Sequence, residues 1–466
     1  MRFPSALLVL LPLTVAVSAC SGGDKKGSDS TSAPEVDTAA PVEGPSGTAV
    51  TIAGANFGDE QGTGAVTFGG SAATIQSWSD TSIVATVPTA AFPGSRDITV
   101  TTVVDASNTV PFRVILPRAL YVNDDIMPAS GPNSIEALAV SAAGALTDIP
   151  GSPRIQGVNG PGYGGYDGGT LALNEGTRRV LTTGFASMTS WDIDPATGAL
   201  TSAGTIALGG NYIYGVVVNQ AGTRAYVADY DNSRVYGVGI AANGALSALP
   251  GSPYDAGATA GTARLSLSVD ETRLYSANES SSLGSLHGYD IGVDGSLTEL
   301  AGSPFDQPDL TYAFARAPDA DRFYLGNNDY ISAYVPDSAG DLSENVALRE
   351  FMPGNAFLSF AGTGDRLFAL TDATPVPNEA DLHVFDVAGS GELVAVAGSP
   401  FTLQGFPVRG SIVHANADGT LLLVKDRDQA ALHVYTIDGG GLPTEVAGSP
   451  FSLEVGSRAS GRALTF

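Results

Sequence analysis

The sequence predicts an all-β protein, a seven-bladed β-propeller closed by its C-terminal strand and preceded by an N-terminal immunoglobulin-like β-sandwich. Its 466 residues include 58 Gly and 28 Pro, and only 15% of them are charged, which is typical of turn-rich β structure. No long segment after the N-terminus repeats apolar residues at helical spacing. A strand pattern instead recurs about every 50 residues through the larger, C-terminal part of the chain.

The repeat is marked by a glycine, a turn residue and a leucine that opens a strand. Each unit also contains a first strand, a turn with Asp, Gly or Arg, a second strand such as Ala225–Asp229, and a third such as Leu432–Tyr435. Four strands per period of about 50 residues are typical of a propeller blade. Seven copies predict seven blades, and their leucines are Leu146, Leu200, Leu246, Leu297, Leu342, Leu393 and Leu442.

The ends of the repeat region predict how the ring closes. The first unit begins at Arg118 with Ala119–Asn123, which aligns with the second strands of the other units. The missing first strand is found at Ser460–Phe466, which aligns with the other first strands. We therefore expect residues 117–466 to form the propeller, with the last residues beside Tyr121, which would remove an open sheet edge.

Residues 41–116 have a different pattern of short alternating strands separated by glycine-rich turns, as a β-sandwich requires. Val50–Gly58 and Val66–Gly70, with the strands that follow, resemble the IPT/TIG domain. The resemblance implies a spacer or an adhesive module. Phe57 and Phe68 are predicted to lie in its core.

The N-terminus is typical of an export signal. Arg2 precedes an apolar run, Ala6–Val17, that is too short to span a membrane. Val17-Ser18-Ala19-Cys20 resembles a bacterial lipobox, which implies cleavage after residue 19 and lipidation of Cys20, the only cysteine. Residues 20–40 are predicted to be a flexible tether, and Ser21 implies an outer-membrane lipoprotein of the cell envelope, on an undetermined side.

The charge balance limits the possible partners. A net charge of −26 and a pI near 4.2 would repel phosphate backbones, so the sequence predicts no nucleic-acid partner. The same charge disfavours anionic lipid surfaces. Membrane contact is therefore expected through the lipid anchor only.

A second motif points to a known family. Five units end in Gly-Ser-Pro, mostly followed by Tyr or Phe, and several second strands are similar to Tyr226-Val227-Ala228-Asp229. This combination resembles the lactonase-type propellers related to bacterial 6-phosphogluconolactonase. The resemblance implies the propeller architecture and, as an alternative function, lactone hydrolysis in the channel. The motif glycines are Gly151, Gly251, Gly302, Gly398 and Gly448.

Residues suited to catalysis occupy repeat positions. His287, His383 and His433 share one place in three third strands, so they are expected around the ring and are interpreted as structural, as is His414 near a turn. No metal-type histidine pair, nucleophile motif or calcium loop is present. The sequence predicts no metal and no cofactor, and it assigns no catalytic residue. The turn arginines are interpreted as packing residues: Arg178, Arg224, Arg273, Arg322 and Arg366.

The predicted binding face is the channel mouth where second strands end and first strands begin. Loops at such a mouth commonly carry binding residues, and two longer insertions, 155–169 and 371–381, fall there. Amides and carboxylates that end second strands would form a polar rim, although such residues also bond to their own turns: Asn123, Asp229, Asn278, Asn327, Asp372 and Asp426. Residues that begin first strands would form a funnel with cationic character: Tyr214, Arg264, Tyr312, Arg409 and Arg458.

These patterns favour a surface- or periplasm-exposed, lipid-anchored binding or scaffolding protein whose ligand is a glycan, a peptide or a small anion. The alternative is an extracytoplasmic lactonase-type hydrolase acting in the channel. A third possibility is adhesion through the sandwich. A convergent Arg with Glu, Asp or His in the channel would favour the enzyme.

Overall fold

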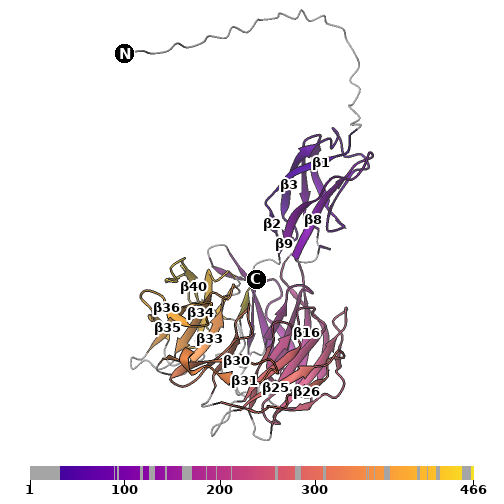
Figure 1. Cartoon of the computed structure of the whole chain (residues 1–466). Coiled ribbons are helices and arrows are strands. Elements are labelled where there is room, and N and C mark those ends of the chain that lie inside the picture. The colour runs from indigo at the N-terminus through magenta and orange to yellow at the C-terminus, as the bar shows by residue number, and fades with distance from the viewer. Residues whose placement is uncertain are drawn as a thin grey trace, which may run out of the picture.

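The computed structural model describes most of the chain from Ser32 onward. The described residues are 32–465 without positions 89, 92–93, 116–118, 125–131, 142–143, 160–170, 185, 196, 211–212, 258–260, 279–284, 308–310, 353, 355, 362, 372–377, 407–409, 417, 427–430 and 454–462. They form an N-terminal sandwich and a larger ring of sheets (Figure 1). Their single helical element is the 3-10 turn η1 (Val346–Leu348), so the all-β prediction is confirmed.

The N-terminal domain is built from two facing β-sheets. One sheet has the order β1 (Glu35–Ala40), β3 (Ala49–Ala55), β7 (Ser82–Thr86) and β6 (Thr74–Ser79). The other has the order β2 (Glu43–Gly44), β9 (Val110–Val114), β8 (Gly94–Thr101), β4 (Ala65–Phe68) and β5 (Ser71–Ala72).

The core between these sheets confirms the sequence pattern. Phe57 and Phe68 are both buried, and Phe68 meets Phe112 edge to face at 5.1 Å between ring centroids. The boundary at residue 40 was wrong, because β1 pairs with β3 and belongs to the sandwich. Gly54 permits this pairing: a Cβ there would lie 2.0 Å from the carbonyl oxygen of Glu35. Val36 and Ala39 are buried on either side of a register shift in β1, and both lie in the predicted tether.

The remaining sheets form seven four-stranded blades, each antiparallel, as the repeat predicts. The first strands lie against those of neighbouring blades around the central channel. In blade order they are β43 (Ala463–Thr465), β14 (Leu171–Asn174), β18 (Ile213–Val218), β23 (Thr262–Leu267), β28 (Ala313–Arg316), β33 (Ala356–Phe360) and β38 (Gly410–Ala415). The second strands are β10 (Ala119–Asp124), β15 (Arg179–Gly184), β19 (Arg224–Asp229), β24 (Arg273–Asn278), β29 (Phe323–Gly326), β34 (Arg366–Thr371) and β39 (Leu421–Asp426).

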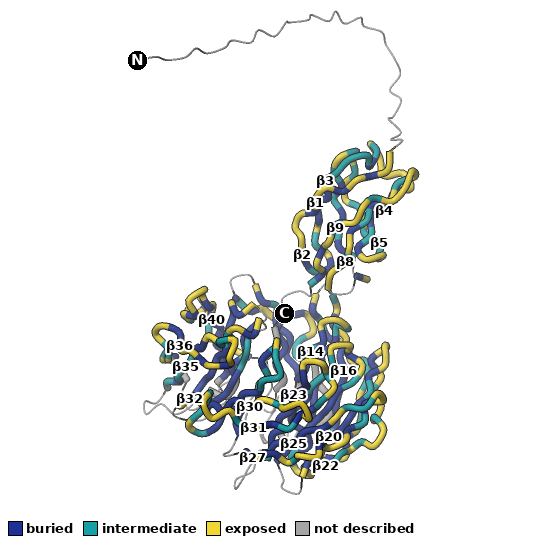
Figure 2. Tube along the Cα trace, in the orientation of Figure 1, coloured by how far each residue is buried: buried dark blue, intermediate teal, exposed yellow. Residues whose placement is uncertain are grey.

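The third and fourth strands complete each blade, and the fourth strands are the more exposed (Figure 2). The third strands are β11 (Pro132–Val140), β16 (Ser187–Ile193), β20 (Arg234–Ile240), β25 (Ser285–Ile291), β30 (Tyr330–Pro336), β35 (Asn378–Val387) and β40 (Ala431–Ile437). The fourth strands are β12 (Leu146–Asp148), β17 (Leu200–Ala207), β21 (Leu246–Ala248), β26 (Leu297–Glu299), β31 (Leu342–Glu344), β36 (Leu393–Ala395) and β41 (Pro443–Glu445). Six blades add a short strand beside the third: β13 (Arg154–Asn159), β22 (Tyr254–Asp255), β27 (Phe305–Asp306), β32 (Glu350–Phe351), β37 (Phe401–Phe406) and β42 (Phe451–Ser452).

The ring closes as the sequence predicts. β43 pairs antiparallel with β10, so that Leu464 lies opposite Tyr121. The first blade therefore takes three strands from the beginning of the propeller region and one from the C-terminal end of the chain. This pairing covers the edge that β10 would otherwise expose.

The repeat glycines occupy the turn between third and fourth strands, where each has a positive φ of 76° to 93°. Side chains with a Cβ rarely adopt this conformation, which explains why glycine marks every unit. The register in the seventh unit was wrong by one residue. Gly441, with φ 86°, occupies the turn, Pro443 begins β41 in the place of the leucine, and Leu442 is 50% exposed.

Hydrogen bonds between side chains and turns join neighbouring blades. Tyrosine hydroxyls of four second strands donate to the carbonyl of the turn glycine in the next blade, in the pairs Tyr121 with Gly198, Tyr226 with Gly295, Tyr275 with Gly340, and Tyr324 with Gly391. Arginines at the start of second strands donate to the same turns, as Arg366 does to the carbonyls of Asp438 and Gly439. In the second blade this arginine is Arg179, and not Arg178 as expected.

The Gly-Ser-Pro motif has a packing role in the five units that carry it. Each serine Oγ accepts a hydrogen bond from a backbone N–H of its own blade's third strand, such as Gly237 to Ser252 at 3.0 Å. The other pairs are Ala137 with Ser152, Gly288 with Ser303, Val384 with Ser399, and Val434 with Ser449. The motif therefore attaches the chain to its blade before the chain crosses to the next one.

Candidate functional site

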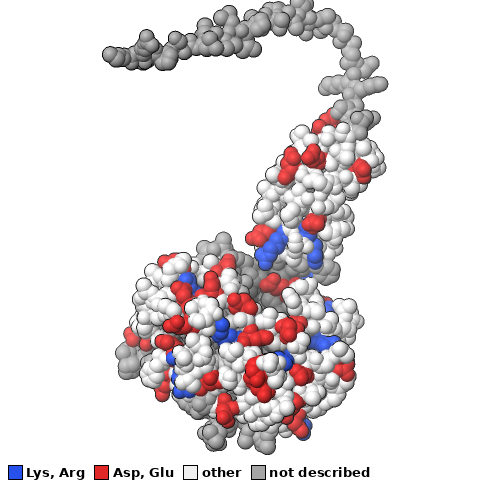
Figure 3. All heavy atoms as spheres, viewed as in Figure 1, with Lys and Arg blue, Asp and Glu red and all other residues white. Residues whose placement is uncertain are grey.

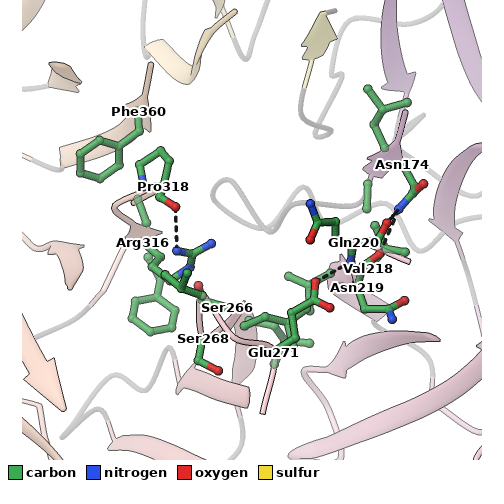
Figure 4. A pocket seen from close by; sticks show the side chains of 18 of the residues that line it. Asn174, Val218, Asn219, Gln220, Ser266, Ser268, Glu271, Arg316, Pro318 and Phe360 are labelled. Carbon is green, nitrogen blue, oxygen red and sulfur yellow. Dashed lines mark hydrogen bonds between the residues drawn. The ribbon is translucent and has the colours of Figure 1, made fainter. Parts of the chain in front are cut away.

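A cavity of about 940 Å³ lies at one end of the central channel. Its walls come from six blades, the second to the seventh, at the places where first strands enter the turn to the second strands (Figure 4). This is the end of the channel opposite to the predicted mouth. Its volume falls in the upper range of small-molecule sites.

Arg316, the last residue of β28, supplies the only cationic Arg or Lys side chain among the described residues that line this cavity. Its Nη1 donates to the carbonyls of Ala317 at 2.8 Å and Pro318 at 3.2 Å. Those two bonds hold the guanidinium group, while Nε and Nη2 have no acceptor among the described residues. Burial lowers the pKa of Arg316, against the opposing effects of Asp321, Glu271 and Asp319.

Glu271 and Gln220 form the part of the wall that lies across from Arg316 (Figure 4). The backbone N–H of Gln220 donates to Oε1 of Glu271, so a carboxylate of the fourth blade is held by a turn of the third. Glu271 has a positive φ of 57° in its own turn. Its second oxygen and the side-chain amide of Gln220 keep hydrogen-bonding capacity for a ligand.

Several other polar groups in the wall serve the turns instead. Asn174 donates to the carbonyls of Asn219 and Gln220, both at 2.9 Å, and its Oδ1 accepts from Thr177. Asn219 bonds to Thr223 and Arg224 within its own turn. These amides fix the shape of the wall.

Phe360, at the end of β33, adds an aromatic surface on the same side as Arg316 and Pro318 (Figure 4). Its ring lies 5.3 Å from the ring of Tyr324 and is partly exposed. Ser266 of β23 adds a hydroxyl group. The cavity thus combines one guanidinium with two carboxylates, those of Glu271 and Glu175, and with amides, hydroxyls and an aromatic face. This set suits a small hydroxylated ligand whose acidic group pairs with Arg316.

The predicted polar rim is buried where it is described. Asp229, Asn278 and Asn327 are 0% exposed, and their side chains bond within the protein. Asp229 accepts from Asn232 and Tyr236, Asn278 bonds to Thr262 and Ser285, and Asn327 bonds to Thr311 and Ser332. These three side chains are bonded inside the protein near the channel mouth, so the structure does not place them on a solvent-exposed rim.

The predicted funnel is described only in part. Arg264 is 4% exposed, and Tyr214 and Tyr312 are each 9% exposed. Tyr214 packs edge to face on Tyr230, and Tyr312 packs edge to face on Phe357. Both tyrosine side chains therefore contribute to the packing of the propeller. Cys20, Asp372, Arg409 and Arg458, with the side chains of Asn123 and Asp426, lie outside the described residues.

The histidines divide into two groups. His287, His383 and His433 lie in third strands, away from the channel, as expected. His414, which was interpreted as structural, lines the cavity from β38. No cluster of three or more metal-ligating side chains occurs in the described part of the chain. None of its helical elements is long and apolar enough to cross a membrane.

The repeat pattern predicted a binding face at the opposite end of the first strands, so the cavity residues were not predicted. A signal was present in the repeat. Arg316 occupies the position before the turn where the aligned units have apolar residues, such as Val218, Leu267 and Phe360. A single cation at a position that is otherwise apolar in a repeat indicates a role outside packing.

The outer surface of the propeller is acidic. Asp and Glu are spread over the visible face of the propeller, with few Lys or Arg between them (Figure 3). This distribution agrees with the net charge of −26. A guanidinium inside the channel is therefore a local exception to the charge of the whole protein.

Comparison with known proteins defines both domains at the level of fold. Residues 34–114 match the model of the IPT/TIG domain. No curated protein matches the chain. A candidate 6-phosphogluconolactonase from Bacteroides fragilis is 14% identical, with a TM-score of 0.58 over 75% of this chain and 98% of that one.

A periplasmic gluconolactonase from Pseudomonas aeruginosa is 15% identical, with a TM-score of 0.57 over 73% of this chain and 97% of that one. At such identities the likeness is one of fold. The chain therefore consists of an IPT/TIG domain followed by a propeller with the fold of the 6-phosphogluconolactonase-like proteins.

Proposed function

We propose that this protein is a lipid-anchored binding protein of the cell envelope whose propeller channel holds a small hydroxylated carboxylic acid, such as a sugar acid. The observation that carries the proposal is the position of Arg316 in the cavity wall, where described carbonyls hold its Nη1 and no described residue accepts from Nε or Nη2. A carboxylate fits these parallel donors.

The neighbouring groups select the rest of the ligand. Gln220, Ser266 and the second oxygen of Glu271 would bond to hydroxyl groups, and Phe360 would cover a sugar-like ring. Glu271 disfavours a second acidic group on the ligand, because like charges would then face each other in a partly desolvated site. A monoanionic polyol therefore matches the wall better than a phosphate or a dicarboxylate.

The test is calorimetry on the full-length protein with D-gluconate, D-glucuronate and the neutral sugar D-glucose. We expect the acids to bind and glucose to bind more weakly. Arg316→Gln should weaken binding of the acids about 10- to 100-fold, since bonds to a charged group are worth about 1.5–3 kcal/mol. Arg349→Gln is the matched control, because Arg349 pairs with Glu344 on the outer part of the fifth blade. Equal binding by the Arg316 variant and the wild type would contradict the proposal.

Lactone hydrolysis is the second candidate function. Its support is that Arg316, Glu271 and His414 all line the same cavity and that two proteins of similar fold have names referring to lactonases. Turnover of aldonolactones by the full-length protein, lost in Glu271→Gln and in His414→Gln, would establish it. Binding of the acid without turnover of the lactone would support the binding function and contradict lactone hydrolysis.

The proposal places the protein at the outer membrane through a lipid on Cys20. Its support is the lipobox-like Val17-Ser18-Ala19-Cys20 and the presence of one cysteine in the chain. A diacylated cysteine combines two acyl chains, enough for stable anchoring.

A further inference from the structure

A continuous chain of side-chain hydrogen bonds crosses the fourth blade from the channel strand to the outer edge. Thr262 Oγ1 donates to Asn278 Oδ1 at 3.0 Å, and Asn278 Nδ2 lies 3.1 Å from Ser285 Oγ. Ser285 Oγ lies 3.1 Å from His287 Nε2, and His287 Nδ1 lies 2.9 Å from Glu299 Oε1. The hydrogen-bonded side chains come from all four strands of the blade, one each from β23, β24 and β26 and two from β25.

The direction of every bond follows from one backbone carbonyl. Asn278 Nδ2 also donates to the carbonyl oxygen of Ala256 at 3.1 Å, and a carbonyl can only accept. This fixes which end of the Asn278 side chain is the nitrogen, so Ser285 Oγ accepts a bond from it. The remaining Ser285 hydroxyl proton is then directed to His287 Nε2.

The tautomer of the histidine is set from the other side as well. His287 Nε2 accepts a hydrogen bond from Ser285, so Nδ1 carries the proton and donates a hydrogen bond to Glu299. Ser303 Oγ donates to the same Glu299 oxygen at 2.7 Å and holds the carboxylate in place. A hydroxyl that donates to an imidazole, which is oriented by a carboxylate, is the arrangement that activates a serine nucleophile.

Two other blades show what is particular to the fourth. In the seventh blade His433 pairs with Glu445 at 2.9 Å and Ser449 holds the carboxylate, but Ala431 stands where Ser285 does. In the sixth blade His383 has Asp381 and Ala395 at the corresponding positions. The histidine–glutamate pair is therefore a repeated structural device. The serine is an addition to it in the fourth blade.

We infer that Ser285 is a reactive nucleophile that forms a covalent acyl adduct with small activated esters, at a site separate from the channel cavity. Ser285 is partly exposed, whereas the His287 side chain is only 4% exposed. Ser285 Oγ bonds to the ester carbonyl carbon, its proton passes to His287 Nε2, and the alcohol leaves with that proton. Water then hydrolyses the acyl-serine by the reverse proton route.

The experiment treats the full-length protein with a small fluorophosphonate, which bonds to an activated serine at phosphorus and releases fluoride. We expect one adduct in the intact mass, mapped to Ser285 in peptides, and none in Ser285→Ala. His287→Asn should slow labelling by about 10²- to 10⁴-fold, the usual contribution of a general base. Glu299→Gln should slow it less, because the imidazole remains while its orientation is weakened.

Control variants separate reactivity from folding. Ser252→Ala removes the equivalent Gly-Ser-Pro serine in the third blade, whose hydroxyl accepts from Gly237 and contacts neither His287 nor Glu299, so it should keep the adduct. Melting temperatures of all variants identify any loss of labelling that comes from unfolding. Absence of an adduct on the wild-type protein, or labelling of Ser285 at the same rate in a folded His287→Asn variant, would overturn the inference.

Discussion

Four tyrosines at equivalent positions connect neighbouring blades by the same hydrogen bond. Each hydroxyl is buried and donates to the carbonyl of a turn glycine, as Tyr226 does to Gly295 at 2.9 Å. Removing one partner of a buried bond leaves the other without compensation, which costs about 1–3 kcal/mol. Contacts between blades thus depend on single atoms as well as on apolar packing.

Tyr226→Phe should lower the free energy of unfolding by about 1–2 kcal/mol, since the Gly295 carbonyl loses its donor. Guanidinium chloride denaturation measures it. Tyr254→Phe is the control, because its hydroxyl donates to the exposed carbonyl of Pro250 and should cost less. Equal losses for both variants would count against a special role for the buried bond.

The same tyrosines predict how stability depends on alkaline pH. Burial raises the pKa of Tyr226 and Tyr275 to about 12, while an unfolded tyrosine titrates near 10. Between these values the unfolded chain loses protons that the folded chain retains. Their stabilising contribution is therefore complete below pH 10 and is lost as the pH rises through about 12. Denaturation midpoints should fall over this range, and less steeply in Tyr226→Phe.

At the scale of elements, the short strand β43 completes the ring of blades. Three residues, Ala463–Thr465, supply the channel-side strand of the first blade and cover the edge of β10. Without them, the backbone groups of β10 around Tyr121 lose their partners. An uncovered edge can also pair with another chain.

Deletion of residues 463–466 should therefore destabilise the protein by more than about 3 kcal/mol, the upper range of effects for single changes, and promote association. Thermal melting and light scattering coupled to size exclusion measure the two effects. Deletion of residues 21–31, which precede the described sandwich, is the control and should change neither. An unchanged melting temperature after removal of β43 would show that the ring does not need this strand.

The sequence predicted the elements well because their signals are local and repeated. A turn glycine with positive φ and an alternating strand beside it recur in every blade, so one wrong register, at Leu442, did not affect the fold. The boundary before β1 failed for a different reason. Val36 and Ala39 are a weak apolar signal, and only their pairing with β3 reveals the strand.

The candidate site was less predictable, because it depends on which end of a strand faces open space. Asp229 and Asn278 have the residue types of a binding rim, yet they bond inside the blade. Arg316 lies at the opposite end and has no motif around it. The Ser285 chain is also hidden in the sequence, since Ser285, His287 and Glu299 come from two strands and their order shows no spacing typical of catalysis.

At the scale of the whole molecule, the proposed lipid anchor on Cys20 predicts where the two domains act. Cys20→Ser should abolish lipid attachment and release the protein from membranes, whereas the sandwich and the propeller should fold as before. Detergent phase partitioning and metabolic labelling with an alkyne fatty acid measure the change. Membrane retention of the Cys20→Ser protein without lipid would contradict the anchor.

The position of β43 also sets an order of events. This strand leaves the ribosome after every other strand of the ring, so during synthesis the first blade lacks its inner strand. The ring can therefore be completed only after its last strand has been synthesised. A prematurely terminated product would keep an open edge at Tyr121, by which proteases could distinguish it from a finished protein.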